Sequence, residues 1–287
     1  MEAIVEASRA YSSYFLALLL TLPRIYAFLN ASQLLNPGAV PAIPRTAAIL
    51  SLALVAVPIN LEYAASFDRS ASTLLFYFAK EYAIGFLAGY LIGWMFWVVQ
   101  ATGGLIDSQR GAAIASSIDP LQGEESSSLG NLLSQAFLTY IFTTGAFLLV
   151  LGVLYKSYAL WPAAKAVPLI SDIFPAMVLG LFDNAMRLTF VIATPILAIM
   201  FLAEFALAVI SRFAPQVQVF VLAMPIKSIL AVFVLIFYIP TLLSFAERQF
   251  VSSERYIGQL YELLRLGEKI ELPKAIPPSA PPERGRK

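Results

Sequence analysis

Residues 103–135 read GGLIDSQRGAAIASSIDPLQGEESSSLGNLLSQ, a polar, glycine- and serine-rich passage between two strongly apolar blocks. Asp107 and Arg110 are spaced to share one face of a helix, and Gly111 follows them with no side chain to hold another backbone away. Pro120 is expected to end that helix, because the residue before a proline is disfavoured in the α region. The passage therefore predicts a short amphipathic helix inside an apolar protein, which suits a pore lining or a subunit contact better than a plain connector.

The composition around this passage is that of a membrane protein. Of the 287 residues, 59% are apolar and 13% are charged, whereas soluble domains carry about 45–50% apolar and about 25% charged residues. Eight of the 19 basic residues and six of the 18 acidic ones fall in residues 246–287, so the first 245 residues hold only 11 and 12. We therefore expect an all-α membrane-class body over residues 1–245, followed by a charged amphipathic helix and a disordered C-terminal tail over residues 246–287.

Several functions are excluded by composition. The net charge is +1, which indicates no general attraction to nucleic acid. The chain has no cysteine and no histidine, so disulfides, thiol catalysis, imidazole-based triads and the usual zinc sites are excluded. We expect no enzyme activity, no cofactor and no metal. A cleavable signal peptide is not expected either, because Glu2 and Glu6 precede the first apolar run, where a signal peptide has a basic leader.

The apolar blocks predict helices over residues 10–29 (interrupted at Pro23), 46–61, 74–101, 129–155, 173–213 and 217–245, followed by the charged amphipathic helix over residues 246–266. Their lengths do not fit a simple set of spans, since about 20 helical residues cross ~30 Å of hydrocarbon. Residues 46–61 would reach only about 24 Å, and residues 173–213 would reach about 61 Å if straight. We therefore expect the latter helix to break near Pro195 or to extend beyond the bilayer, in a polytopic fold of helical hairpins and broken helices.

Four charged residues lie inside apolar blocks: Asp183, Arg187, Glu204 and Lys227. Each would cost about 2.5–3.5 kcal/mol if it faced lipid at mid-membrane. Together they approach the whole stability of a domain, roughly 5–15 kcal/mol, so they must face protein, water or each other. Asp183 and Arg187 are predicted to form an i,i+4 ion pair, and such a pair could equally serve only to fix helix register.

Three glycines, Gly85, Gly89 and Gly93, recur at every fourth position just before the polar passage. Glycines on one helix face let a neighbouring helix approach backbone to backbone. Ordinary packing within the chain is the simpler reading of this pattern. A subunit interface is the second reading, and both can hold.

Two long motifs carry a resemblance to a known family. Residues 105–112 (LIDSQRGA), 118–124 (IDPLQGE) and 129–135 (LGNLLSQ) resemble the signature of the T component of the type III secretion export apparatus. Residues 204–216 (EFALAVISRFAPQ) and 219–227 (VFVLAMPIK) are similar to a segment shared by injectisome T proteins and their flagellar R counterparts. The likeness covers roughly residues 10–245, and the paired Asp107 and Arg110 favour the injectisome branch.

The resemblance implies a non-enzymatic role in a bacterial inner membrane. Members of the family join the R and S subunits in a closed, helical export gate at the centre of the secretion machine's basal body. Unfolded substrate proteins pass through this gate, and a U-type switch protein wraps its cytosolic entrance. The basic tail of the present chain would favour a cytoplasmic C-terminus by the positive-inside rule.

The resemblance also assigns roles to residues. A gate constriction or a contact with a neighbouring subunit is expected at the first motif and its turn, which comprise Asp107, Arg110, Gly111, Asp119, Pro120 and Gly123. The second motif contributes Glu204, Arg212, Pro215 and Lys227. Arg212 to Pro215 reads as the turn of a helical hairpin, and a salt bridge between Glu204 and Lys227 that holds the hairpin shut is the simpler reading of those two charges.

Two other functional classes compete with the export gate. A secondary transporter or ion channel could use Glu204, Asp183 and Lys227 to bind or relay a coupling ion, since broken helices and intramembrane charges also suit transporters. The two halves of the sequence show no inverted repeat, which weakens that reading. An intramembrane enzyme would need a Ser–Lys arrangement or an aspartate pair, and no aspartate pair lies in a suitable apolar setting.

Overall fold

The structure is a computed structural model that describes residues 2–35, 40–65, 67, 70–111, 127–161, 173–214 and 219–252. Over these residues the chain forms helices and no strand, which confirms the all-α prediction. The helices are α1 (Glu2–Ala31), α2 (Ala42–Ala65), α3 (Ala71–Gln109), α5 (Ser128–Thr143), α6 (Ala146–Leu160), α7 (Ile173–Phe213) and α8 (Val219–Ser252). By length and composition, five of the described helices could cross a membrane, or six spans if α5 and α6 count as one broken span. The chain is a multi-pass membrane protein.

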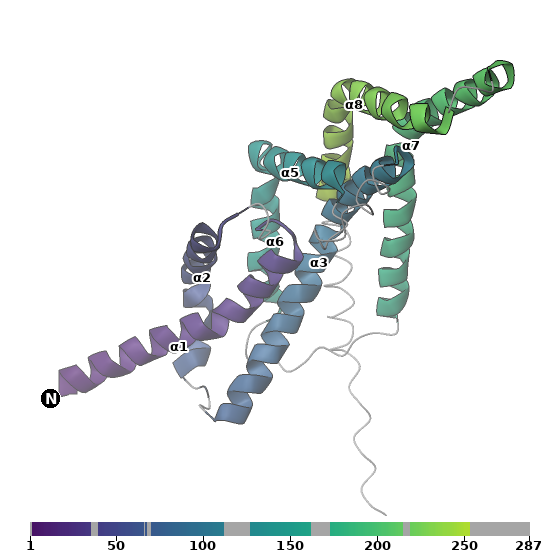
Figure 1. The fold of residues 1–287 in the computed structure, drawn as a ribbon. Coiled ribbons are helices and arrows are strands. Elements are labelled where there is room, and N and C mark those ends of the chain that lie inside the picture. Colours follow the sequence, from purple (N-terminus) through teal and green to yellow (C-terminus); the bar gives the residue numbers. More distant parts are fainter. Residues whose placement is uncertain are drawn as a thin grey trace, which may run out of the picture.

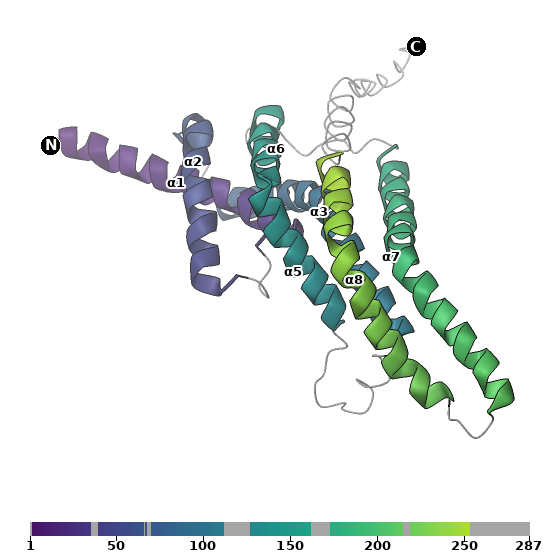
Figure 2. The same cartoon turned by 90° about the horizontal axis from the view of Figure 1, so that it is seen from above.

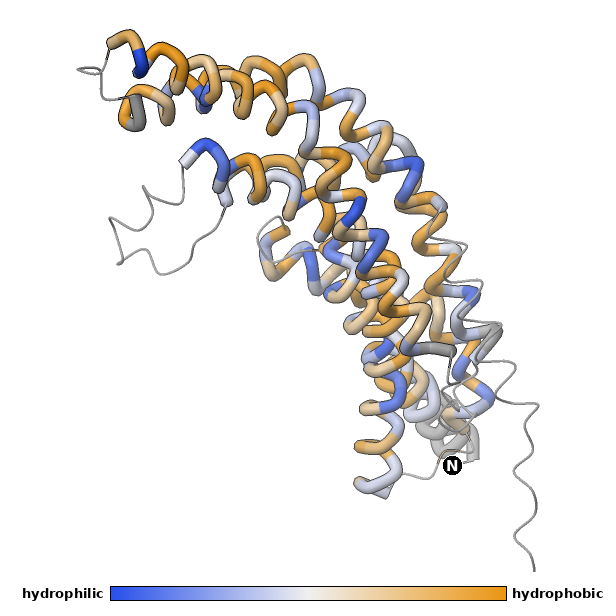
Figure 3. Tube along the Cα trace, turned by 90° about the vertical axis from the view of Figure 1, so that its right-hand side faces the viewer, coloured by the Kyte–Doolittle hydropathy of each residue, from blue (hydrophilic) through white to orange (hydrophobic). Residues whose placement is uncertain are grey.

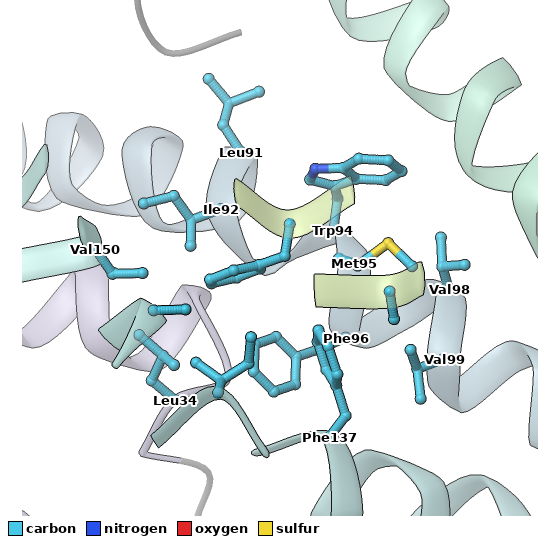
Figure 4. Close-up of a cluster of buried hydrophobic side chains, with 14 of the residues drawn as sticks. Leu34, Leu91, Ile92, Trp94, Met95, Phe96, Val98, Val99, Phe137 and Val150 are labelled. Carbon is cyan, nitrogen blue, oxygen red and sulfur yellow. The ribbon is translucent and has the colours of Figure 1, made fainter. Parts of the chain in front are cut away.

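The long helix α3 is the centre of the arrangement (Figure 1). It packs against α1 along its first half and against α5 and α7 along its second half, while α2 packs on α1. The main core gathers around the middle of α3, where buried side chains of several helices meet (Figure 4). The ring centroid of Phe96 on α3 lies 4.8 Å from that of Phe137 on α5 and 5.9 Å from that of Phe250 on α8. These rings join three helices in one cluster.

The glycine pattern of α3 faces α1. A Cβ atom added to Gly85 or Gly89 would collide with the backbone carbonyl groups of Arg24 or Phe28 on α1, and one added to Gly93 would meet the carbonyl oxygen of Ala31 at 2.5 Å. The two helix backbones therefore approach as closely as the missing side chains allow. In the described residues these glycines serve packing within the chain.

The predicted interruption of the first helix is wrong, because α1 runs without a break through Pro23. For α7 the sequence predicts either a break near Pro195 or an extension beyond the bilayer, and the structure has one helix of 41 residues that bends along its length (Figures 1 and 2). A proline removes one backbone hydrogen bond and bends a helix, but it need not end the helix where apolar side chains on both sides stay packed. α2 is longer than predicted, with 24 residues, because Pro44 lies in its first turn, where a missing N–H is tolerated. This helix is therefore long enough to span a membrane, contrary to the prediction.

The predicted helix over residues 129–155 is in fact two helices. α5 and α6 meet at a bend of 80°. Gly145 at the bend has φ of 79°, a left-handed conformation that glycine adopts without strain. At the other end of the chain, α8 continues past residue 245 to Ser252, so the start of the charged segment extends the same helix. Residues 253–287 lie outside the described residues.

The helices α7 and α8 form a hairpin that projects beyond the rest of the body (Figures 1 and 2). Its residues are mostly hydrophobic along its length (Figure 3). Only 28% of the most apolar window of α7 and 22% of that of α8 are buried within the chain. The hairpin therefore presents most of its apolar surface outward.

Candidate functional site

The first motif forms a junction between the end of α3 and the start of α5. Asp107, in the last turn of α3, is only 5% exposed. Its Oδ1 lies 2.7 Å from Nη2 of Arg110, which confirms the predicted pairing on one helix face. Its Oδ2 accepts hydrogen bonds from the hydroxyl of Ser127 at 2.7 Å and from the backbone N–H of Leu129 at 3.0 Å. The carboxylate of Asp107 thus contacts two residues that lie 20 and 22 positions further along the sequence.

This carboxylate completes the N-terminus of α5. The N-cap Ser127 accepts a hydrogen bond from Gly130 N–H at 2.8 Å, and Asp107 accepts one from the N–H of Leu129. A negative charge at a helix N-terminus is stabilised by the N–H groups that lack intrahelical partners. Gly103 of α3 lies directly against the backbone of Gly130, so the two helices touch without intervening side chains. The junction is tight and rich in hydrogen bonds.

Gly111 connects the two sequence motifs. It has φ of 86° and follows the C-cap Arg110, whose N–H donates to the carbonyl of Ile106 at 3.1 Å. A Cβ atom on Gly111 would lie 3.4 Å from Cγ of Met224, a residue of the second motif on α8. Helix α3 therefore ends at Gln109 through a left-handed glycine, and the expectation that the helix stops at Asp119-Pro120 is wrong. Asp119, Pro120 and Gly123 themselves lie outside the described residues.

The second motif lies on the α7–α8 hairpin. Nζ of Lys227 lies 3.3 Å from Oε2 of Glu204, so the predicted salt bridge across the hairpin is present. The lysine side chain is 12% exposed and the glutamate side chain 54% exposed. Arg212 lies in the last turn of α7, where a cation is favoured, and Pro215 lies outside the described residues.

The predicted ion pair between Asp183 and Arg187 is absent. Nη2 of Arg187 instead donates to Oδ1 of Asn184 at 2.8 Å. Asp183 and Arg187 are both exposed on the outside of α7. The i,i+4 spacing is right for a pair, but the neighbouring amide offers the guanidinium a closer acceptor.

The body contains a buried charge cluster that the sequence did not predict. Nε of Arg24 on α1 donates to Oε2 of Glu81 on α3 at 2.7 Å, and both side chains are fully buried. Nζ of Lys80 lies 3.2 Å from the other oxygen of Glu81. Nη2 of Arg24 also donates to the carbonyl of Trp161, at the end of α6, at 2.9 Å, and the guanidinium lies 4.2 Å from the ring centroid of Tyr158. The cluster ties α1, α3 and α6 together.

A weak signal for this cluster was available in the sequence. Arg24, Lys80 and Glu81 all fall within or beside apolar blocks, where a charge needs a partner. Their pairing could not be read, because Arg24 and Glu81 are 57 residues apart and Arg24 and Trp161 are 137 residues apart.

A small apolar hollow lies between α3 and α7. Its volume is about 260 Å³, and it is lined by Tyr90, Trp94, Trp97, Leu181, Phe182 and Ala185. None of the charged residues of α7 lines it. Within the described ranges, no group of three acidic side chains is placed to hold a metal ion.

Comparison with known proteins places the chain in a family. The model of the family "Bacterial export proteins, family 1" matches residues 15–253. The Yop proteins translocation protein T of Yersinia pestis is 40% identical over 206 residues, 71% of this chain and 78% of the relative. The surface presentation of antigens protein SpaR of Salmonella typhimurium is 34% identical over 205 residues, 71% and 75% of the two chains. The flagellar biosynthetic protein FliR of Bacillus subtilis is 31% identical over 214 residues, 74% and 82% of the two chains. The chain thus belongs to family 1 of the bacterial export proteins, and its predicted kinship with the T components of type III export is confirmed.

Proposed function

We propose that this chain is a non-enzymatic subunit of a type III protein export apparatus. It joins the R and S subunits to enclose a conduit for unfolded substrate proteins, and a U-type switch protein contacts the cytosolic side of that conduit. Its relatives are named as a translocation protein, a surface-presentation protein and a flagellar biosynthetic protein, which supports a part in export rather than catalysis. The large apolar surface of the α7–α8 hairpin supports assembly with other subunits.

The observation that carries the proposal is the meeting of the two family motifs at the end of α3. Gly111 of the first motif, which directly follows the paired Asp107 and Arg110, lies next to Met224 of the second. We assign this junction to a constriction of the conduit or to a contact with a neighbouring subunit. Charged groups held in fixed positions beside a flexible methionine suit either role.

A transporter is less well supported. Glu204 and Lys227 neutralise each other across the hairpin, while Asp183 lies apart on the outside of α7. The hollow between α3 and α7 has no charged residue in its lining. The three charges that a coupling ion would need are therefore not gathered around one site.

We assign the multi-pass body to the inner membrane, within the basal body of a secretion system. The basic C-terminal tail favours a cytoplasmic C-terminus, because cytoplasmic segments next to membrane spans carry an excess of Lys and Arg.

A secretion assay tests the proposal. Arg110→Glu places two carboxylates side by side at the junction, so in a strain that lacks the native gene it should abolish secretion while the protein is still expressed. Arg248→Glu, the same change at an exposed site on α8, is the matched control and should secrete normally. The wild-type chain should also co-purify with R and S subunits after the membrane is solubilised in detergent. Normal secretion by Arg110→Glu would contradict the assignment of the junction, and transport of a small solute by the chain alone in liposomes would contradict the function.

A further inference from the structure

Helix α5 has two chemically different faces. One face lies in the core that α5 shares with α3 and α8, and it buries apolar side chains one turn apart: Leu129, Leu133, Phe137 and Ile141. On the opposite face, five of the seven exposed residues of α5 are polar and uncharged: Ser128, Asn131, Gln135, Thr139 and Thr143. Leu132 and Phe142 are the other two. We call the five polar residues the polar face of α5.

The exposed surface of α8, which lies beside α5 (Figure 2), differs from this face. Between residues 221 and 237, every exposed residue of α8 is apolar, so hydrocarbon can cover that surface. Side-chain amides cannot be covered in the same way, because moving an amide out of water without a hydrogen-bond partner is costly. Within the described residues, the amide of Gln135 has no hydrogen bond. The polar face of α5 therefore lies against water or against hydrogen-bonding groups from outside the described chain.

The polar face begins at the junction of α3 with α5. Ser128 directly follows Ser127, whose hydroxyl donates to Asp107. Gln100 on α3 is also exposed, and its Nε2 donates to Oδ1 of Asn131 at 3.5 Å. By length and composition α5 and α6 together could form one broken span, and polar side chains on a span face the protein interior or a water-filled space. The polar face thus extends the junction along α5 as an uncharged, hydrogen-bonding surface.

We propose that the polar face of α5 lines the conduit and forms hydrogen bonds with the backbone of an unfolded substrate protein in transit. This inference rests on the proposed function, since it presumes that the chain encloses a conduit. An unfolded protein presents an N–H donor and a C=O acceptor at nearly every residue, and the amides of Asn131 and Gln135 offer both complementary groups. Because the face carries no charge, it favours neither acidic nor basic segments of the substrate.

Introducing a charge at Gln135 tests the lining. Two reporter substrates are compared, one with an unfolded acidic segment and one with a basic segment of equal length, and the ratio of their secretion rates with the wild-type chain is the reference. Gln135→Lys should slow the basic reporter relative to the acidic one by about fivefold, the effect of one unit charge at ~4 Å in water, and Gln135→Glu should shift the ratio the other way. Glu62→Lys, a charge change at an exposed site of α2, is the matched control and should leave the ratio unchanged. Because Gln135 is exposed, its variants should keep the melting temperature of the wild-type chain.

A photo-crosslinking residue in place of Gln135 identifies the occupant independently of secretion rates. With a substrate stalled in the apparatus it should form an adduct with that substrate, whereas the same residue in place of Ile229, which is exposed on α8, should not. An unchanged secretion ratio, or a shift in the same direction for Gln135→Lys and Gln135→Glu, would overturn the lining. Adducts at position 135 with lipid or another subunit only, or no adduct, would overturn it as well. If the wild-type chain itself supported secretion of neither reporter, the proposed function would fail instead, which separates the two outcomes.

Discussion

The buried pair of Arg24 and Glu81 allows a prediction about relative stability. Glu81 is the carboxylate that both Arg24 and Lys80 contact, at 2.7 and 3.2 Å. Replacing Glu81 by methionine leaves two cations side by side in the interior. Replacing Arg24 by methionine leaves Glu81 still paired with Lys80. We therefore expect Glu81→Met to be the more destabilising of the two changes.

The size of the expected loss in stability follows from the burial of this ion pair. Arg24 and Glu81 are fully buried, and breaking a buried ion pair by removing one partner costs about 3–5 kcal/mol. We expect Glu81→Met at the upper end of that range and Arg24→Met at the lower end, where the freed carbonyl of Trp161 adds to the loss. For a chain of this size, each kcal/mol lowers the melting temperature by about 2–4 °C, so Glu81→Met should lower it by roughly 10–20 °C.

The assay is thermal unfolding of the purified chain in detergent, followed by circular dichroism at helical wavelengths. Glu62→Gln is the matched control, because Glu62 is exposed on α2, and surface changes of this kind shift stability by only about 0.5 kcal/mol. Equal melting temperatures for Arg24→Met and Glu81→Met would refute the shared role of Glu81. A shift below that of the control in both variants would show that the cluster adds no stability.

Two glycines give further tests, with Gly152→Ala as their common control, because a Cβ atom on Gly152 meets nothing within 4 Å. Gly89→Ala drives a methyl group into the carbonyl of Phe28, so it should lower the melting temperature by several degrees, in line with about 1–3 kcal/mol for overpacking. An unchanged value would mean that α1 and α3 can move apart freely. Gly111→Ala places an alanine in the left-handed conformation of Gly111, which should destabilise the chain by about 1–2 kcal/mol. Gly111→Asn should destabilise it less, because asparagine tolerates this conformation better than alanine does. Equal melting temperatures for these two variants would argue against the left-handed helix end.

Local features of the chain were predictable from the sequence. The limits of α7 were predicted as residues 173–213, because Arg212 and the following proline mark a helix end, and the structure has the same limits. The contact of Asp107 with Arg110 follows from helical spacing alone. The salt bridge of Glu204 with Lys227 follows from a hairpin that brings the two together. Each of these involves residues on one helix or on two helices joined by a short turn.

The features that the sequence did not predict depend on packing between distant segments. Pro23 was expected to interrupt α1, but its local preference is weaker than the packing of the apolar stretch around it. The bend at Gly145 lies in an apolar block with no proline to mark it. The pairing of Arg24 with Glu81 requires that α1 and α3 cross at one particular point along their lengths. The glycines of α3 permit this close crossing but do not specify where along α1 it occurs.

The charges of the apolar body fall into two groups, and the difference follows from burial. Exposed charges such as Glu62 and Asp183 form no ion pair within the described residues, because water can solvate them at little cost. Arg24 with Glu81, Asp107 with Arg110, and Glu204 with Lys227 are each paired within the chain. These pairs fix α1 on α3, the end of α3 near α5, and α7 on α8. A charge-reversing substitution at one of the pairs should therefore disturb the arrangement of the helices, whereas the same change at an exposed and unpaired charge should not.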